Sequence, residues 1–228
     1  MTKVDPVVSV VIPAFKEGKT IRKVIQDLKS YSTYNTEIIV VDGYSNDGTE
    51  EIVKEENARF VSESRIGYGR AIKTGIDHAK GDVLVIIDAD DTYQADAIDK
   101  LVQPLLKGEA DVCLASRLGG TILPGAMPGM NLFGNRMFTP MYNVIYGQNV
   151  TDTQTGFRAL TKKTIECLDL HSDGMGLSTV FLTEAAKRGF KITEFSTVYR
   201  PRDDNSRSKL NRLKAGWEIL RILLFGQA

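Results

Sequence analysis

Three carboxylates follow an uninterrupted apolar run near the middle of the chain. Residues 83–87 are all aliphatic, and Asp88, Ala89, Asp90 and Asp91 come directly after them. Such a run predicts a buried strand, and ligands of open α/β sheets bind where strands end. If the strand stays extended, Asp88 and Asp90 face the same side, and their oxygens suit Mg²⁺ or Mn²⁺. The alternative is that one carboxylate caps the next helix and the other is solvated.

Polar and aromatic residues also follow two earlier strand patterns. Pro13, Phe15 and Glu17 come after the apolar residues 7–12, and Asp42 comes after the apolar residues 38–41. Pro13 and Phe15 have a purely structural alternative, a strand end with a packed ring. For Asp42 the alternative is an ordinary turn, because Asp-Gly sequences favour turns.

Strand and helix patterns alternate through the first half of the chain. This alternation predicts an α/β fold with a mostly parallel sheet flanked by helices on both faces. The expected strands are 7–12, 37–41, 59–62, 82–88 and 111–116, and the expected helices are 19–31, 49–57, 68–80 and 95–107.

The second half predicts an elaboration packed against the sheet, within one domain of residues 1–228. Glycines and prolines mark 119–134 as a loop, and the expected later elements are helices 131–146, 161–168, 177–188 and 208–225 with a strand at 191–199. In the last helix Leu213, Trp217, Leu220 and Leu224 form one apolar stripe. The stripe is expected either to dock on the domain or, with residues 222–225, to contact lipid.

Composition excludes several classes of protein. The 228 residues are 42% hydrophobic and 25% charged, and the 29 basic residues equal the 29 acidic ones, so net charge gives no reason to expect nucleic-acid binding. Cys113 and Cys167 are isolated, which fits a reducing compartment. The first six residues lack the apolar core of a signal peptide, and no apolar stretch is long enough to span a bilayer. We therefore expect a protein in the cytoplasm, peripheral to the membrane at most.

Basic residues concentrate near the carboxyl end. Residues 200–214 contain six Lys or Arg against two Asp. A cationic segment before an amphipathic helix suits an anionic head group at a membrane surface. Arg117, Arg136 and Arg158 are candidates to join it around a phosphate, since guanidinium groups bind phosphate oxygens in pairs. The alternative is that they are scattered surface arginines.

Several motifs together resemble a known family. They are residues 10–17, residues 40–49 and Asp88-Ala89-Asp90, joined by residues 155–159 and Ser208-Lys209-Leu210. In this combination the chain resembles the family 2 inverting glycosyltransferases of GT-A fold, and within them the polyprenyl-phosphate (dolichyl-phosphate mannose synthase-like) enzymes. The resemblance implies metal-dependent transfer of a sugar from a nucleotide sugar to a polyprenyl or dolichyl phosphate, at a membrane surface.

The resemblance also implies a division of roles among residues. It implies that residues 1–117 bind the nucleotide sugar and that residues 118–228 bind the acceptor. Gly43 and Thr92 depart from the mannose synthase pattern, which leaves both UDP- and GDP-sugars open as donors. The implied sites are Pro13, Phe15, Glu17, Asp42, Gly69, Asp88 and Ala89 for the nucleotide sugar; Asp88, Asp90 and Asp91 for the metal; Asp90, Arg158 and Arg202 for catalysis; and Arg117, Arg136, Arg158, Arg202 and Lys209 for the acceptor phosphate.

The acceptor decides whether a general base is needed. A phosphate monoester is mostly ionised near pH 7, so it can attack without one. A hydroxyl acceptor, on a polysaccharide or glycolipid, would instead need a base such as Asp152 or Glu184. A third reading, from another class, is a non-catalytic nucleotide-sugar binding subunit.

Overall fold

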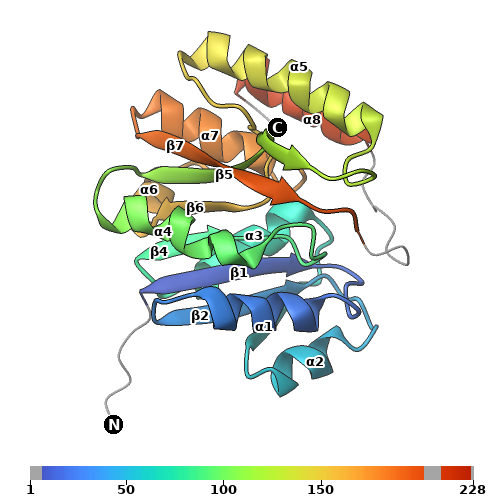
Figure 1. Cartoon of the computed structure of the whole chain (residues 1–228). Helices are drawn as coiled ribbons and strands as arrows, with labels where there is room; N and C mark the ends of the chain where they lie inside the picture. Colours follow the sequence, from blue (N-terminus) through green and yellow to red (C-terminus); the bar gives the residue numbers. More distant parts are fainter. Residues whose placement is uncertain (1–6, 203–211, 227–228) are drawn as a thin grey trace.

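The protein is built on one seven-stranded sheet with the strand order β3-β2-β1-β4-β6-β5-β7 (Figure 1). The computed structural model describes residues 7–202 and 212–226. All neighbouring strands are parallel except β6, which runs antiparallel to both β4 and β5. The strands are β1 (Val8–Ala14), β2 (Thr36–Asp42), β3 (Arg59–Ser62), β4 (Val83–Ile86), β5 (Val112–Ile122), β6 (Arg158–Thr161) and β7 (Ile192–Tyr199).

Helices cover both faces of the sheet, as the sequence predicts. They are α1 (Ile21–Tyr31), α2 (Thr49–Glu55), α3 (Tyr68–His78), η1 (Ala95–Ala97), α4 (Ile98–Leu106), α5 (Gly129–Tyr146), α6 (Lys162–Cys167), α7 (Leu177–Lys187) and α8 (Arg212–Phe225). The two hydrophobic cores divide by strand alternation: Val10 and Ile12 of β1 join α1 and α4, whereas Val11 joins α3, α7 and α8 on the other face. Beyond α7, the helices α5 and α8 pack against each other (Figure 1).

The strand order creates a switch point between β1 and β4. The chain builds β1, β2 and β3 outward in one direction, and then places β4 on the opposite side of β1. Ala14 of β1 is in register with Asp42 of β2, and Val11 with Ile86 of β4. The segments that follow these three strands therefore leave the sheet at one edge, where α/β proteins bind their ligands.

Two expectations for the second half were wrong. The antiparallel strand β6 was not predicted, because at 4 residues it is too short to show an alternation. Residues 119–122 were predicted as loop, yet β5 continues to Ile122 and resumes pairing with β7 at Thr121 after a register shift. Gly120 permits this, since a Cβ there would lie 2.0 Å from the Thr197 carbonyl oxygen. The glycines that suggested a loop instead let two strands approach closely.

Of the apolar stripe expected on the last helix, Leu220 packs against the core and the other three residues face solvent. Helix α8 docks through Ala215, Ile219, Ile222 and Leu223, which are buried. Leu213, Trp217 and Leu224 of the stripe are 82%, 64% and 51% exposed. The helix therefore presents apolar side chains on two sides, one toward α5 and α7 and one toward solvent. Residues 208–211 of the expected helix lie outside the described residues.

None of the helices within residues 7–202 and 212–226 combines the length and the apolar character that a bilayer crossing needs.

Candidate functional site

The turn that carries Asp88 and Asp90 is fixed by side chains from three elements. The Oγ1 hydroxyl of Thr20, next to α1, donates to the Ala89 carbonyl oxygen at 2.7 Å. The Tyr68 hydroxyl, on the first residue of α3, donates to Asp88 Oδ1 at 3.1 Å. Asp90 Oδ1 accepts from Thr92 Oγ1 at 2.6 Å and from the Thr92 backbone N–H at 3.2 Å. The two carboxylates thus lie in a hydrogen-bonded turn directly beyond β4, at the switch-point edge.

Asp90 is close enough to Asp88 to affect the ionisation of Asp88. Burial, together with the negative charge of Asp90, raises the pKa of Asp88 to about 6. Burial also raises the pKa of Tyr68, whose hydroxyl therefore stays protonated and donates to Asp88. A pair of carboxylates held in this way favours any cation that binds between or beside them.

One oxygen of Asp90 has the surroundings of a cation ligand. Asp90 is 3% exposed, and its Oδ2 accepts no hydrogen bond from the described residues. Among the described residues, the charge that pairs with it is the Arg202 guanidinium, which also lies 3.5 Å from Glu17 Oε1. A buried carboxylate oxygen without a donor is satisfied by a positive charge. The oxygen donors of Asp88 and Asp90 therefore fit Mg²⁺ or Mn²⁺, which prefer carboxylate ligands.

Asp91 does not join the other two carboxylates in a common cluster. Its backbone has a positive φ of 57°, and its carboxylate forms an ion pair with Lys23 of α1 at 2.8 Å. In the part of the chain that the structure describes, no group of three or more His, Cys, Asp or Glu side chains could hold a metal ion. The structure thus brings two of the three expected metal ligands together and leaves Asp91 facing α1.

The loops after β1 and β2 meet through Ser45. The carboxylate of Asp42 accepts from the Ser45 backbone N–H at 2.8 Å and from its hydroxyl, and Ser45 Oγ in turn accepts from the Lys16 backbone N–H at 2.7 Å. Asp42 therefore stabilises a turn, which is the structural alternative that the sequence indicates for this residue. Gly43 leaves room for the Phe15 ring, since a Cβ there would lie 3.3 Å from Phe15 Cδ2.

The other residues of this region surround the same edge. Pro13 is in register with Val41, near the end of β1, and the Glu17 side chain is buried against Arg202. Ala89 lies between the two carboxylates and is buried. The edge of the sheet thus gathers the expected nucleotide-sugar residues from the loops after β1, β2 and β4.

The start of α3 is used for packing. The backbone N–H groups of Gly69 and Arg70 donate to the carbonyl oxygens of Gly174 and Asp173, both at 3.1 Å. A Cβ on Gly69 would lie 2.8 Å from the carbonyl oxygens of Ser172 and Gly174. Gly69 is therefore required by the contact between α3 and residues 172–174. Its amide is already bonded, so it is not free to bind a phosphate.

The expected acceptor arginines occupy different environments. Arg158 is buried and donates to the carbonyl oxygens of Ser178, at 2.8 Å, and Thr155. Arg136 is exposed on α5, and Lys209 lies outside the described residues. Of the expected acceptor residues that the structure describes, Arg202 is the one in contact with the carboxylates, through Asp90 and Glu17.

The two candidate general bases are both engaged in ion pairs. Asp152 is completely buried and accepts from Arg117 Nε at 2.7 Å and from a terminal nitrogen of Arg117 at 3.0 Å. Arg117 also stacks over the Tyr199 ring at 5.2 Å. Glu184 pairs with Lys187 at 3.1 Å and with Arg188, and these contacts lower its pKa.

One residue of the site, Gly156, was given no role from the sequence, whereas Thr92 and Tyr93 were expected to help shape the sugar pocket. A Cβ on Gly156 would lie 2.1 Å from Asp88 Oδ2, so only glycine allows the backbone after α5 to approach this carboxylate. The Gly156 N–H donates to the Tyr93 hydroxyl at 2.6 Å, and the Tyr93 ring packs edge-on against Phe157 and Tyr199. Gly156 belongs to the 155–159 motif, but its contact with Asp88, 68 positions earlier, cannot be predicted from the spacing of residues.

The chain belongs to the family described as glycosyl transferase family 2, which matches residues 9–169. It is 35% identical over 210 residues to glycosyltransferase AglJ of Haloferax volcanii, covering 92% of this chain and 68% of AglJ. It is 32% identical over 196 residues to a dolichyl-phosphate hexose transferase of the same organism, covering 85% and 83%. A longer relative from the same organism, the hexosyltransferase Agl6, is 31% identical over 229 residues. That match covers 97% of this chain but only 54% of Agl6.

The fold is shared with solved glycosyltransferases of GT-A type. Glucosyl-3-phosphoglycerate synthase of Mycobacterium tuberculosis, in complex with Mn²⁺, uridine-diphosphate-glucose and phosphoglyceric acid, superposes with a TM-score of 0.77. The match covers 98% of this chain and 81% of that one, at 24% identity. The expected GT-A fold and family are thus confirmed, and the protein is a glycosyltransferase.

Proposed function

We propose that this protein transfers a sugar from a nucleoside-diphosphate sugar to a polyprenyl or dolichyl phosphate, with a divalent metal ion and with inversion at the anomeric carbon. The observation that carries the proposal is the buried Oδ2 of Asp90, which accepts no hydrogen bond from the described residues and forms an ion pair with the Arg202 guanidinium. It lies at the switch-point edge, where the fold binds ligands.

Asp88 and Asp90 are the residues that would hold Mg²⁺ or Mn²⁺. The ion would offset the negative charge that builds up on the departing nucleoside diphosphate. The chain's own contribution is positional: Thr20, Tyr68 and Thr92 fix the turn, and Gly156 lets Asp88 reach its place. The Mn²⁺ and uridine-diphosphate-glucose bound in the solved synthase support the same use here, with a UDP-sugar favoured over a GDP-sugar.

Two observations support a phosphate acceptor. One relative is named a dolichyl-phosphate hexose transferase. In addition, the two carboxylates considered as bases for a hydroxyl acceptor are both held in ion pairs, Asp152 by Arg117 and Glu184 by two basic neighbours on α7. An ionised phosphate oxygen has no proton to lose, so it needs no base. Its attack from the side opposite the leaving diphosphate inverts the configuration at the anomeric carbon.

A lipid-linked acceptor requires contact with a membrane surface, and α5 and α8 supply apolar side chains for it. On α5, Met130 and Phe133 are 61% and 70% exposed, and α8 adds the exposed Leu213 and Trp217. The two helices lie side by side in Figure 1. Arg136 of α5 adds an exposed basic side chain. Exposed apolar groups next to basic ones are typical of helices at anionic lipid surfaces.

We place the donor site on residues 1–117 and the acceptor site on residues 118–228, at the cytoplasmic face of the membrane. The carboxylate turn and the loops after β1 and β2 belong to the first part. The second part contributes Gly156, Arg202 and the two apolar helices.

A transfer assay tests the proposal. Purified protein with Mn²⁺ or Mg²⁺ and polyprenyl monophosphate is offered labelled UDP- and GDP-sugars one at a time. We expect one donor to move label into the organic phase, and Asp90→Asn to abolish this. Label that stays aqueous with every donor, with nucleotide-sugar binding intact, would contradict the proposal.

A further inference from the structure

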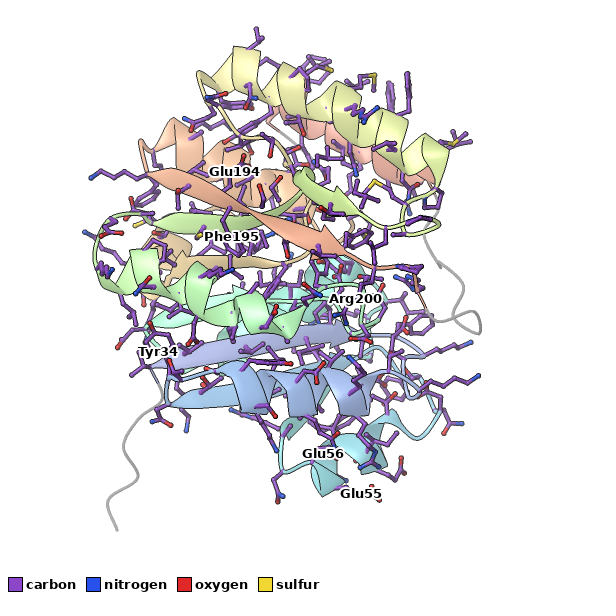
Figure 2. All side chains as sticks on the ribbon, viewed as in Figure 1. Tyr34, Glu55, Glu56, Glu194, Phe195 and Arg200 are labelled. Atoms are coloured by element: carbon purple, nitrogen blue, oxygen red, sulfur yellow. The ribbon has the colours of Figure 1, made fainter. Side chains whose placement is uncertain are left out.

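Arg202 is held over the carboxylate turn by the backbone on its amino-terminal side. The Arg200 N–H donates to the Thr92 carbonyl oxygen at 2.9 Å, and Tyr93 and Tyr199 form an isolated antiparallel bridge. Figure 2 labels Arg200 at the end of β7, on the side of the sheet where β1 also ends. These contacts tie residues 199–200 to the segment just after Asp90, so Arg202, two residues further on, reaches the turn.

The Arg202 guanidinium takes the place of a bound cation. It contacts Asp90 Oδ2 and lies 3.5 Å from Glu17 Oε1. Asp90 is almost fully buried, whereas the Arg202 side chain is 31% exposed. A buried carboxylate is destabilising unless a positive charge accompanies it. Arg202 supplies that charge to the same oxygen that we assign to the metal.

We propose that Arg202 is an internal counterion, which neutralises Asp90 in the donor-free enzyme and has to withdraw when the metal–nucleotide complex binds. This inference rests on the metal role proposed for Asp90. Two cations cannot share one carboxylate oxygen at contact distance without strong repulsion, so the ion pair competes with the metal. Withdrawal leaves the guanidinium free to pair with the phosphate oxygens of the acceptor, which is absent when the metal–nucleotide complex binds alone.

Because of this competition, removing Arg202 is expected to change the metal–nucleotide affinity in the opposite direction from removing an ordinary binding residue. If Arg202 only helped to bind the diphosphate, its removal would weaken metal–nucleotide binding. If it neutralises Asp90 first, removal exposes an unpaired carboxylate and strengthens that binding.

Binding of Mn²⁺ in the presence of UDP or GDP, followed by the EPR signal of free Mn²⁺, tests the inference without turnover. We expect Arg202→Gln to bind Mn²⁺–nucleotide about fivefold more tightly than the wild type. Arg202→Lys keeps a charge and is expected to fall between them. Arg200→Gln, which removes one nearby positive charge but not the contact with Asp90, is the matched control and should stay within about twofold.

Thermal unfolding establishes that each variant is folded before its affinity is compared. Weaker or unchanged binding by Arg202→Gln, or equal tightening by Arg200→Gln, would overturn the inference. If the wild type binds the complex and Asp90→Asn does not, the proposed metal site stands even when Arg202→Gln has no effect. If the wild type and Arg202→Gln both fail to bind it, the metal role of Asp90 is wrong and the inference falls with it.

Discussion

Arg117 of β5 and Asp152, in the segment after α5, form a two-point ion pair in the interior of the protein. The two Asp152 oxygens accept from the guanidinium at 2.7 and 3.0 Å, and Asp152 Oδ2 also accepts from the Arg117 backbone N–H at 3.0 Å. The Gln154 backbone N–H also donates to Asp152 Oδ1, at 3.2 Å, so this completely buried carboxylate has four donors and the partners of a structural residue. Removing one member of such a pair leaves the other buried without a partner.

Replacing Asp152 with Asn is therefore expected to lower stability more than catalysis. Breaking a buried ion pair costs about 3–5 kcal/mol, and the retained amide oxygen reduces this to about 2–4 kcal/mol. Activity measured well below the unfolding temperature should stay within about tenfold of the wild type, because loss of a general base costs about 10²–10⁴. Urea unfolding and initial transfer rates provide the two measurements.

Glu184→Gln is the matched comparison, because Glu184 also forms ion pairs but makes them with Lys187 and Arg188 on its own helix. It should cost less stability, since Lys187 and Arg188 are 41% and 36% exposed and remain hydrated when Glu184 no longer pairs with them. A loss of 10³ or more in turnover for either variant at full folding would show that a hydroxyl acceptor and a base are in use.

Gly156→Ala is expected to displace Asp88. The added methyl carbon would lie 2.1 Å from Asp88 Oδ2, far inside van der Waals contact, so the carboxylate or the backbone has to move. A displacement of about 1 Å at a reacting centre costs about 100-fold in rate. We expect a loss of that size in transfer and a clear loss of Mn²⁺–nucleotide affinity.

Gly134→Ala is the control for that substitution. Gly134 is within α5, and its new Cβ would lie an ordinary 3.6 Å from Phe138. Alanine in a helix should stabilise the protein by up to about 1 kcal/mol and leave donor binding unchanged. Equal activity of Gly156→Ala and the wild type would show that Asp88 has no positional role.

The position of Asp88 and Asp90 at the edge of the sheet could be predicted from the sequence because it depends on local order. Asp88 and Asp90 follow a buried strand, and such strands deliver their next residues to one edge of the sheet. The same reasoning failed for Asp91, one residue further, because a positive φ turns its side chain toward Lys23. Backbone conformation in a turn is set by tertiary contacts that spacing does not encode.

The second half of the chain was harder to predict for a physical reason. Arg158 matches a family motif, yet it is one of the largest fully buried side chains and bonds to backbone carbonyl oxygens. Helix α8 has apolar residues on two sides, so periodicity alone selected the exposed stripe instead of the one that packs. In both cases the neighbour that decides the outcome is distant in sequence.

Asp88→Asn should stabilise the protein at neutral pH. The folded-state pKa of about 6 lies above the ordinary 3.8, so the folded state binds more protons and stability rises as pH falls from 6 toward 4. The Asp88→Asn variant removes this dependence of stability on pH. Above pH 6 it should be more stable than the wild type by up to about 2 kcal/mol, while binding Mn²⁺–nucleotide less tightly.

Glu63→Gln is a control, because the Glu63 carboxylate makes stability depend on pH with the opposite sign. Arg65 and Thr74 lower the pKa of Glu63 to about 2, so this carboxylate stabilises the fold above pH 4.5 and the effect is lost as pH falls toward 2. Thermal unfolding measured between pH 3 and 8 should show that each substitution removes only the pH dependence of stability that its own carboxylate causes. A neutral-pH destabilisation by Asp88→Asn would contradict the repulsion between Asp88 and Asp90.

The exposed apolar side chains of α5 and α8 are expected to mediate lipid contact. Phe133→Ser combined with Trp217→Ser should reduce co-sedimentation with anionic vesicles severalfold and change stability little, since both side chains are mostly exposed. Tyr31→Ser with Leu106→Ser removes apolar groups that are 50% and 43% exposed on α1 and α4, and should have no effect. Equal vesicle binding by both pairs would rule out this surface.

A direct comparison of two acceptors tests the central claim. The wild-type enzyme, with Mn²⁺ and the donor it accepts, is offered a polyprenyl monophosphate and, separately, the same polyprenol without phosphate, each in mixed micelles. The account predicts that labelled sugar enters the organic phase with the phosphate alone, and that Asp90→Asn abolishes the transfer. Label on the free polyprenol at a comparable rate would contradict it.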